Sequence, residues 1–204
     1  MKNLQVGGER LVYNIIALIA PYNIGINIAA FQFSKAISSP LLTSIMTYLG
    51  KSFLVVIPLI VLYLYLKKDM NTYSFILAGV LLYVVSDSIK ILVGEVRPCN
   101  IPALSWINNA ACENTFSFPS NHASVLTGLP LFLGRYRILQ ALYIVWLLLV
   151  LFGRVYLGLH YLTDVVAGVI LSLAISYLVY AYREKINRFF NGIVERILPF
   201  LAIK

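Results

Sequence analysis

Long apolar runs are the feature that most constrains the fold of this chain. Several stretches approach the 20 or so residues that a helix needs to cross a hydrocarbon core of about 30 Å. Of the 204 residues, 60% are apolar and 12% are charged, against about 45–50% and about 25% in soluble domains. A soluble protein does not keep so apolar a surface exposed to water. The sequence therefore predicts an all-α, polytopic membrane protein and excludes disordered, collagen-like and coiled-coil chains.

Six stretches are expected to form transmembrane helices within a single domain. They lie near residues 11–31, 50–66, 72–93, 118–134, 138–157 and 161–182. The first is the weakest, because Pro21, Asn23 and Asn27 interrupt it. A cleaved signal peptide is the alternative there, but no clean cleavage site follows.

Two further segments are expected to lie at the membrane surface. Residues 32–49 are expected to form a short helix and a turn at the interface. Residues 183–204 alternate charged side chains with Ile, Phe and Leu, which is typical of an amphipathic helix on a membrane. The whole of 1–204 is then one membrane-embedded domain with a cytoplasmic tail.

The distribution of basic residues predicts the orientation. Six spans put both termini on one side of the membrane. If that side is the cytoplasm, eleven of the sixteen Lys and Arg residues lie inside and five outside, as the positive-inside rule requires. The five outer residues are Lys35, Lys51, Lys90, Arg97 and Arg154. We therefore attribute the net charge of +8 to the membrane topology. The sequence has no basic stripe interleaved with aromatic residues, which nucleic-acid binding would require.

The two cysteines lie in the longest predicted outer loop, residues 94–117. Oxidising conditions prevail outside the cytoplasm of most cells, so Cys99 and Cys112 are expected to form a disulfide. Two free thiols are the alternative, because their spacing does not give the geometry of the loop. The pair also lacks metal-ligand spacing.

Ionisable residues gather at the predicted outer ends of spans three to six. Lys90 and Arg97 are two helical turns apart and share a face if the third span continues that far. A lone lysine there would snorkel to the headgroups. Ser120 or Asn121 would cap the fourth span, whose free N–H groups favour an anion. The alternative is a plain cap beside an interfacial His122.

A histidine and an aspartate open the sixth span. Asp164 follows His160 by four residues, so its carboxylate can accept a hydrogen bond from one ring nitrogen. The other nitrogen then keeps a lone pair that can attack an electrophile. Arg154 closes the fifth span, and intramembrane ionisable residues are functional candidates by default.

The predicted topology brings these groups to one membrane face. The set comprises Lys90, Arg97, Ser120, His122, Arg154, His160 and Asp164. Three cations, two imidazoles, a carboxylate and a hydroxyl suit a dianionic oxyanion, which arginine binds bidentately. The set offers no group of carboxylate, His and Cys ligands for a metal, so neither a metal nor another cofactor is expected.

Three motifs within residues 90–164 resemble those of the type-2 phosphatidic acid phosphatase superfamily. The family's K-x6-R-P is matched by Lys90 and Arg97-Pro98, its P-S-G-H by residues 119–122, and its S-R-x5-H-x3-D by residues 153–164. The motifs occur in order with their spacings intact. The six-helix topology extends the likeness over most of the chain.

The resemblance implies a metal-independent phosphatase with a phosphohistidine intermediate. It implies that His160 attacks phosphorus, that Asp164 orients His160, and that His122 protonates the leaving oxygen and then activates water. The residues that it implies as phosphate-binding are Lys90, Arg97, Ser120, Asn121 and Arg154.

Two residues depart from the motifs. Asn121 replaces a glycine, so the anion pocket is expected to be narrower or to gain a donor. Gly153 replaces a serine, so a hydroxyl is lost. Neither departure touches the groups implied to do the chemistry, and activity is still expected.

A site at the outer face, reached between helices, suits a substrate with a lipid tail. The resemblance favours an isoprenoid diphosphate carrier such as undecaprenyl or dolichyl diphosphate. Its alternatives are phosphatidic acid, phosphatidylglycerol phosphate, and transfer of phosphate to another acceptor. The expected place is the cell membrane, with the site on the extracytoplasmic side and membrane lipids as partners; the oligomeric state is left open.

Two other classes of protein compete with this interpretation. A transporter predicts ionisable groups near the bilayer midplane and internal repeats, whereas these charges lie at span ends. A lipid-binding scaffold would not need His160, His122 and Asp164, because binding alone requires no nucleophile.

Overall fold

The computed structural model describes residues 25–101, 104 and 112–203. Every regular element in these residues is a helix. The α-helices are α2 (Gly25–Ala36), α3 (Pro40–Lys51), α4 (Phe53–Leu66), α5 (Asn71–Val93), α6 (Asn121–Leu126), α7 (Arg137–Tyr156), α8 (Leu162–Ala181) and α9 (Arg183–Ile197). The 3-10 helices are η2 (Pro98–Asn100), η4 (Leu129–Leu133) and η5 (Pro199–Leu201).

Three of the predicted spans are long apolar helices of the expected length. They are α5, α7 and α8, and each is long and apolar enough to cross a membrane. The 23 residues of α5 extend over about 34 Å at about 1.5 Å per residue, which matches a hydrocarbon core of about 30 Å. Helices α3 and α4 form a further pair, bent by 42° at Ser52, that passes the same test together.

The predicted fourth span, 118–134, is not one continuous α-helix. Helix α6 ends at Leu126, and the chain continues in η4. Gly128 donates its backbone N–H to the Ser172 hydroxyl of α8 instead of to its own helix, and Pro130 has no N–H to donate. A Cβ on Gly128 would collide with Ser176 of α8. The break is therefore a consequence of close packing against α8.

The amino-terminal prediction is tested only in part. Residues 1–24, which hold most of the predicted first span, lie outside the described residues. Its last residues belong to α2, whose buried Asn27 exchanges hydrogen bonds with Thr163 of α8. Residues 32–49 fall in the end of α2, a turn and most of α3, where the Ser39 hydroxyl caps α3 by accepting from the Leu42 N–H.

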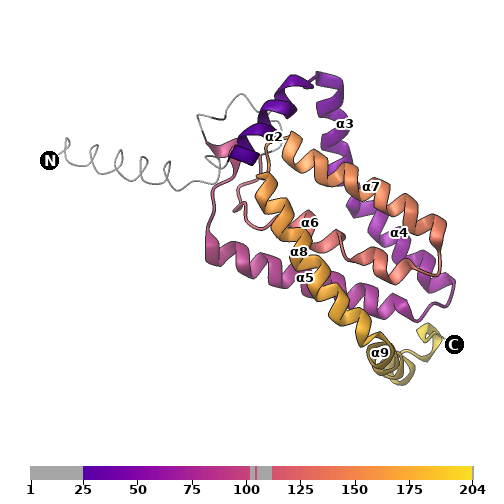
Figure 1. Ribbon diagram of the computed structural model, residues 1–204. Helices are drawn as coiled ribbons and strands as arrows, with labels where there is room; N and C mark the ends of the chain where they lie inside the picture. The colour runs from indigo at the N-terminus through magenta and orange to yellow at the C-terminus, as the bar shows by residue number, and fades with distance from the viewer. Residues whose placement is uncertain (1–24, 102–103, 105–111, 204) are drawn as a thin grey trace.

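The short segment α6–η4 lies at the centre of the bundle. It packs against α5, α7 and α8, which run past it on different sides (Figure 1). Most of its apolar side chains are almost completely removed from solvent, and such burial drives the packing. They include Leu126, Leu129, Phe132 and Leu133.

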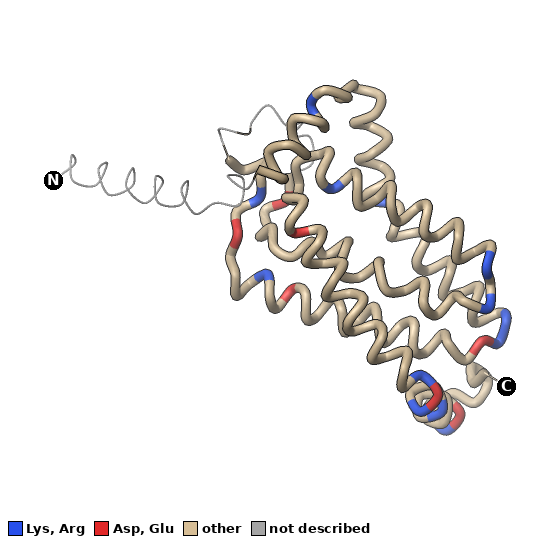
Figure 2. The backbone as a smooth tube through the Cα atoms, viewed as in Figure 1, with Lys and Arg blue, Asp and Glu red and all other residues tan. Residues whose placement is uncertain are grey.

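Charged residues gather at the two ends of the bundle (Figure 2). The middle of α5, α7 and α8 is uncharged, as a membrane interior requires. One end holds the residues singled out by the motifs. The other carries the loops before α5 and α7 together with α9.

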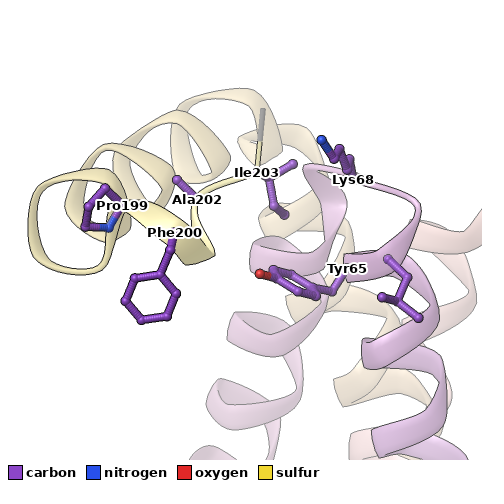
Figure 3. Close-up of a pocket in the computed structure, with 7 residues that line it drawn as sticks. Tyr65, Lys68, Pro199, Phe200, Ala202 and Ile203 are labelled. Carbon is purple, nitrogen blue, oxygen red and sulfur yellow. The ribbon is translucent and has the colours of Figure 1, made fainter.

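The tail folds against this second end. Asn187 of α9 is buried and accepts hydrogen bonds from the Ser74 N–H and hydroxyl of α5. Beyond η5, the Ile203 N–H donates to Asn191. A pocket between the end of α4 and this tail is lined by Tyr65, Leu66, Lys68, Pro199, Phe200, Ala202 and Ile203 (Figure 3). It lies at the other end of α5 from the motif residues.

Candidate active site

The motif residues come together at one end of the bundle. The carboxyl ends of α5 and α7 and the amino ends of α6 and α8 meet there, as the predicted topology requires (Figure 1). Lys90, Arg97, Ser120, Arg154, His160 and Asp164 are all buried. Charges removed from water need partners, so their hydrogen bonds define what the site can do.

Arg97 is the most heavily bonded of these residues. Its Nε donates to the Thr115 carbonyl at 2.8 Å and its Nη1 to the Leu159 carbonyl at 2.9 Å. Nη1 also lies 3.0 Å from Nε2 of His160. A guanidinium only donates, so His160 Nε2 must be the acceptor in this contact. The backbone thus fixes Arg97 with one N–H aimed at the histidine.

A carboxylate that the motifs do not include holds the two arginines together. Glu113 lies 2.8 Å from Arg97 Nη2 through one oxygen and 2.8 Å from Arg154 Nη2 through the other. Burial alone would raise the pKa of Glu113, but Arg154 and Arg97 outweigh it and lower that pKa below its ordinary value. Because 45% of the Glu113 side chain is exposed, this anion sits on the solvent side of the two guanidiniums.

The histidine and aspartate of the third motif are adjacent but not directly bonded. Nδ1 of His160 lies 3.6 Å from Oδ2 of Asp164, too far for the expected hydrogen bond. The Ser117 hydroxyl lies between them, 2.5 Å from the same Oδ2 and 3.4 Å from Nδ1. The direct bond predicted from the i, i+4 spacing is therefore wrong in this structure, because Oδ2 also caps α8 by accepting from the Tyr161 N–H.

This arrangement assigns the proton of the His160 ring. With Nε2 accepting from Arg97, the proton of the neutral imidazole is on Nδ1, the side of Ser117 and Asp164. Burial, followed by the positive charges of Arg154 and Arg97, lowers the pKa of His160 well below its ordinary value. His160 is thus a neutral base with a lone pair on the side of the arginines.

Lys90 is directed at the backbone of the loop before α6. Its Nζ donates to the carbonyls of Phe116, Ser117 and Pro119 at 2.9, 3.2 and 2.8 Å. These three bonds use all the protons of an ammonium group. Lys90 therefore stabilises the loop that carries Ser117 and Ser120, while its charge stays in the site.

Ser120 and Asn121 face different neighbours. The Ser120 hydroxyl is buried with no hydrogen-bond partner among the described residues, and its N–H donates to the Asp164 carbonyl. The Asn121 side chain instead contacts α5, where it accepts from the Ser86 hydroxyl at 2.7 Å and approaches Asp87. The sequence predicts a narrower anion pocket or an added donor from this amide; its observed contacts are with α5, so the side chain joins α6 to α5.

His122 lines a cavity that is also lined by Glu113, the carboxylate that bridges the two arginines. The cavity is bounded by Thr47, Gly50, Lys51, Phe53, Cys112, Glu113, His122, Arg154, Leu157 and Leu159. His122 Nε2 lies 3.0 Å from the Gly50 carbonyl, so Nε2 carries the proton in the neutral ring. The edge of Phe53 packs against the imidazole, with ring centroids 4.9 Å apart. His122, Arg154 and Glu113 thus share one opening.

Gly153 faces away from this cavity. A Cβ on Gly153 would lie 3.4 Å from Sδ of Met46 in α3. The departure from serine therefore falls at the α3–α7 contact rather than among the anion-binding groups.

The structure joins Cys99 and Cys112 in a disulfide, with their Cα atoms 5.9 Å apart. Cys99 follows the Arg97-Pro98 dipeptide, and Cys112 precedes Glu113. The bond therefore ties the residue that bridges the arginines to the segment that carries one of them.

The sequence prediction missed Ser117 and Glu113. Neither belongs to a motif, and no periodicity marks loop residues. Glu113 did carry one signal, since it is the acidic residue next to Cys112 in the loop that also contains Arg97.

Comparisons with known proteins identify one family, whose matched members are named as phosphatases of different lipids. A family described as the PAP2 superfamily matches residues 71–188. A lipid A 4'-phosphatase of Bacteroides thetaiotaomicron is 38% identical over 103 residues, 47% of this chain and 46% of that protein. The match thus spans less than half of that relative's length.

Two other relatives are matched over most of their length. An undecaprenyl-diphosphatase of Sulfolobus acidocaldarius is 28% identical over 161 residues, 76% of this chain and 78% of that protein. A phosphatidylglycerophosphatase B of Bacillus subtilis is 32% identical over 178 residues, 75% of this chain and 81% of that protein.

Two solved structures resemble the fold. A transmembrane PAP2-type phosphatidylglycerolphosphate phosphatase from Bacillus subtilis superposes with a TM-score of 0.64 at 28% identity, covering 88% of this chain and 96% of that one. Aquifex aeolicus LpxE superposes with a TM-score of 0.69 at 21% identity, covering 80% and 99%, which is a likeness of fold.

Proposed function

The chain belongs to the PAP2 superfamily, and from this premise we propose that it removes phosphate from a membrane lipid phosphate or diphosphate through a phosphohistidine on His160. The observation that carries the proposal is the contact of Arg97 with both His160 Nε2 and Glu113. It puts a nucleophilic lone pair beside two guanidiniums that already bind an anion.

The substrate phosphate replaces the Glu113 carboxylate between the arginines. Both groups present paired oxygens, and the fork of arginine suits either one. The bound phosphate also draws the Nη1–H of Arg97 from His160 to a phosphoryl oxygen. This exchange frees the Nε2 lone pair at the moment when phosphorus arrives.

In the first chemical step, Nε2 of His160 forms a bond to phosphorus and the bond from phosphorus to the leaving oxygen breaks. His122, which takes up a proton when the anionic phosphate enters beside it, gives that proton to the leaving oxygen. The Nδ1–H of His160 is held by Ser117 and by the negative charge of Asp164, which stabilises the positive charge that develops on the ring.

In the second step, water attacks the phosphohistidine. His122, now neutral, accepts a proton from this water, the P–N bond breaks, and Nε2 regains its lone pair. Inorganic phosphate leaves and both histidines return to their initial state. Arg97, Arg154 and the unpartnered Ser120 hydroxyl stabilise the equatorial oxygens in both steps, so the proposal uses no metal ion.

The membrane topology belongs to the same proposal. The single domain spans residues 1–204, with the motif core at 90–164, six membrane crossings and both termini in the cytoplasm. The site then lies on the extracytoplasmic side of the cell membrane, where the bias of basic residues places Arg97 and Arg154. Helix α9, rich in charge, lies on the inner surface.

The proposed substrate is an isoprenoid diphosphate carrier. Relatives that are named for undecaprenyl diphosphate, phosphatidylglycerophosphate and lipid A all act on phosphate attached to a lipid. Carrier diphosphates are released on the outer face, which favours them. Because the intermediate is covalent, an alcohol that replaces water would make the chain a phosphotransferase.

The test is phosphate release by the purified protein in detergent with EDTA present. The panel contains an isoprenoid diphosphate, phosphatidic acid, phosphatidylglycerol phosphate, a lipid A phosphate and a soluble ester. Release that persists in EDTA and is absent in His160→Ala supports the proposal, and an added alcohol detects transfer. A folded wild-type protein that releases phosphate from none of them would contradict it.

A further inference from the structure

One carboxyl group in the site has no role in the chemistry described above. Glu95 follows Gly94, which ends α5 in the left-handed conformation (φ +66°) that glycine adopts without steric cost. This turn directs the chain back toward α8. The Glu95 carbonyl accepts the Ser117 N–H at 2.7 Å, so the residue is anchored to the loop that bridges Asp164 and His160.

The side chain of Glu95 contacts Asp164. Ser117 joins the two residues, because its N–H donates to the Glu95 carbonyl at 2.7 Å and its hydroxyl donates to Oδ2 of Asp164 at 2.5 Å, and the two carboxyl groups interact with each other. Glu95 Oε1 and Asp164 Oδ1 are buried, and no N–H or O–H group of the described residues donates to either. Two ionised carboxylates repel each other and can only accept hydrogen bonds, so two neighbouring buried carboxyl groups are stabilised by one proton between them.

The donors around the pair show which carboxyl group carries that proton. Oδ2 of Asp164 accepts from the Tyr161 N–H at 2.9 Å and from the Ser117 hydroxyl at 2.5 Å. These bonds favour the ionised form of Asp164. No donor of the described residues reaches Oε1 of Glu95.

The local charges are balanced by the same assignment. The charged groups that face Glu95 are Asp164 from α8 and Lys90 from α5. The three N–H groups of Lys90 donate to backbone carbonyls. Lys90 therefore acts on the two carboxyl groups as one positive charge and donates to neither. One cation then faces one carboxylate and one neutral acid.

We propose that Glu95 is a positioning residue that remains a neutral carboxylic acid and donates a hydrogen bond to Oδ1 of Asp164. This bond fixes the second oxygen of Asp164, while Tyr161 and Ser117 fix the first. Asp164 therefore keeps its negative charge directed at the Nδ1–H of His160. The consequence for turnover rests on the proposed phosphohistidine mechanism, whereas the shared proton does not.

The proton is tested without turnover by infrared difference spectroscopy of the purified protein. Subtracting the spectrum of Glu95→Gln from that of the wild type is expected to leave the carbonyl stretch of a protonated carboxylic acid. This measurement stands even if the chain hydrolyses no lipid phosphate. A difference spectrum that contains only carboxylate bands overturns the proposal.

The positioning role is tested by kinetics. Glu95→Gln keeps a donor of similar length, and its kcat is expected within about threefold of the wild type. Glu95→Ala leaves Asp164 Oδ1 buried without a donor and is expected to lower kcat about 10- to 100-fold with KM unchanged. Glu184→Ala, on the exposed surface of α9, is the matched control.

The two variants separate positioning from a general loss of structure. Rescue by glutamine at an unchanged KM supports the proposal. Equal loss of kcat in Glu95→Gln and Glu95→Ala, or wild-type kcat in Glu95→Ala, overturns it. If Glu95→Ala does not fold, the spectrum and the kcat of Glu95→Gln still decide.

Discussion

Arg97 Nη1 lies 3.0 Å from His160 Nε2, and this contact sets the state of the buried histidine. The guanidinium of Arg97 is always protonated and can only donate a hydrogen bond. His160 Nε2 is therefore the acceptor, and the ring proton is on Nδ1. The same guanidinium binds the Glu113 carboxylate through Nη2. One side chain therefore joins the nucleophile to the anion-binding position.

Arg97→Lys tests whether this geometry, and not charge alone, is required. A lysine keeps the positive charge but cannot contact His160, Thr115 and an anion at the same time. We expect kcat/KM for the best lipid substrate to fall about 100-fold. Arg188→Lys, an exposed change on α9, is the matched control and should have no effect. Wild-type activity in Arg97→Lys would show that charge suffices.

Ser117→Ala tests the hydroxyl that bridges Asp164 and His160. Its loss leaves the two side chains 3.6 Å apart with nothing between them. We expect kcat to fall about tenfold while KM is unchanged. Ser88→Ala removes an exposed hydroxyl of α5 that contacts only its own helix, and serves as the control. A change in KM alone would contradict the role given to Ser117.

Glu113→Ala tests whether this carboxylate competes with phosphate. Without it, Arg97 and Arg154 are free to bind an anion, so inorganic phosphate should inhibit at about fivefold lower concentration. The effect is modest because the bridging carboxylate is half exposed. Glu195→Ala on α9 should leave inhibition unchanged. Weaker inhibition in Glu113→Ala would mean that Glu113 organises the arginines instead of competing for them.

The pH profile follows from the lowered pKa of His160. His160 stays unprotonated in the folded protein below the ordinary imidazole pKa of about 6.5. The acid limb of kcat/KM that belongs to His160 should therefore lie below that pH. The same shift makes the folded state lose stability as pH falls below about 6.5, because only the unfolded chain binds the proton readily.

A second substrate separates the enzyme's ionisation from that of the phosphate. We would compare a lipid diphosphate with an aryl phosphate. A limb that stays in place with both substrates belongs to the protein. A limb near pH 6.5 that both substrates share and that Arg97→Gln does not move would contradict the assignment to His160.

The disulfide should stabilise the loop that carries Glu113. Bonding residues 13 apart restricts the unfolded chain by about 3 kcal/mol. We expect the double change Cys99→Ser and Cys112→Ser to lower the melting temperature in detergent. Mass spectrometry should find neither thiol alkylated in unreduced wild-type protein. Alkylation of both cysteines without reductant would show that the disulfide is not formed.

Much of the helical framework could be predicted from the sequence. Helices α5, α7 and α8 follow from apolar runs of membrane-spanning length, since such runs have few other stable conformations. Alternating spans then require the ends that carry Lys90, Arg154 and His160 to meet. The convergence of the site is thus a consequence of topology and spacing.

The finer structure depends on contacts that a sequence pattern does not record. The break between α6 and η4 results from how closely α8 approaches Gly128. Asn121 turns to α5 because Ser86 offers it a hydroxyl. Glu95 and Glu113 lie toward the two ends of one predicted loop, where no periodicity indicates the direction of a side chain.

The most direct test of the account is to trap the phosphorylated protein. Purified wild-type protein is mixed with a lipid phosphate labelled at phosphorus and quenched within one turnover. We predict label that is stable in alkali, lost in acid, and located on the peptide that contains His160. His160→Ala should acquire none. Turnover by wild-type protein without label on that peptide, or label in His160→Ala, would contradict the phosphohistidine mechanism.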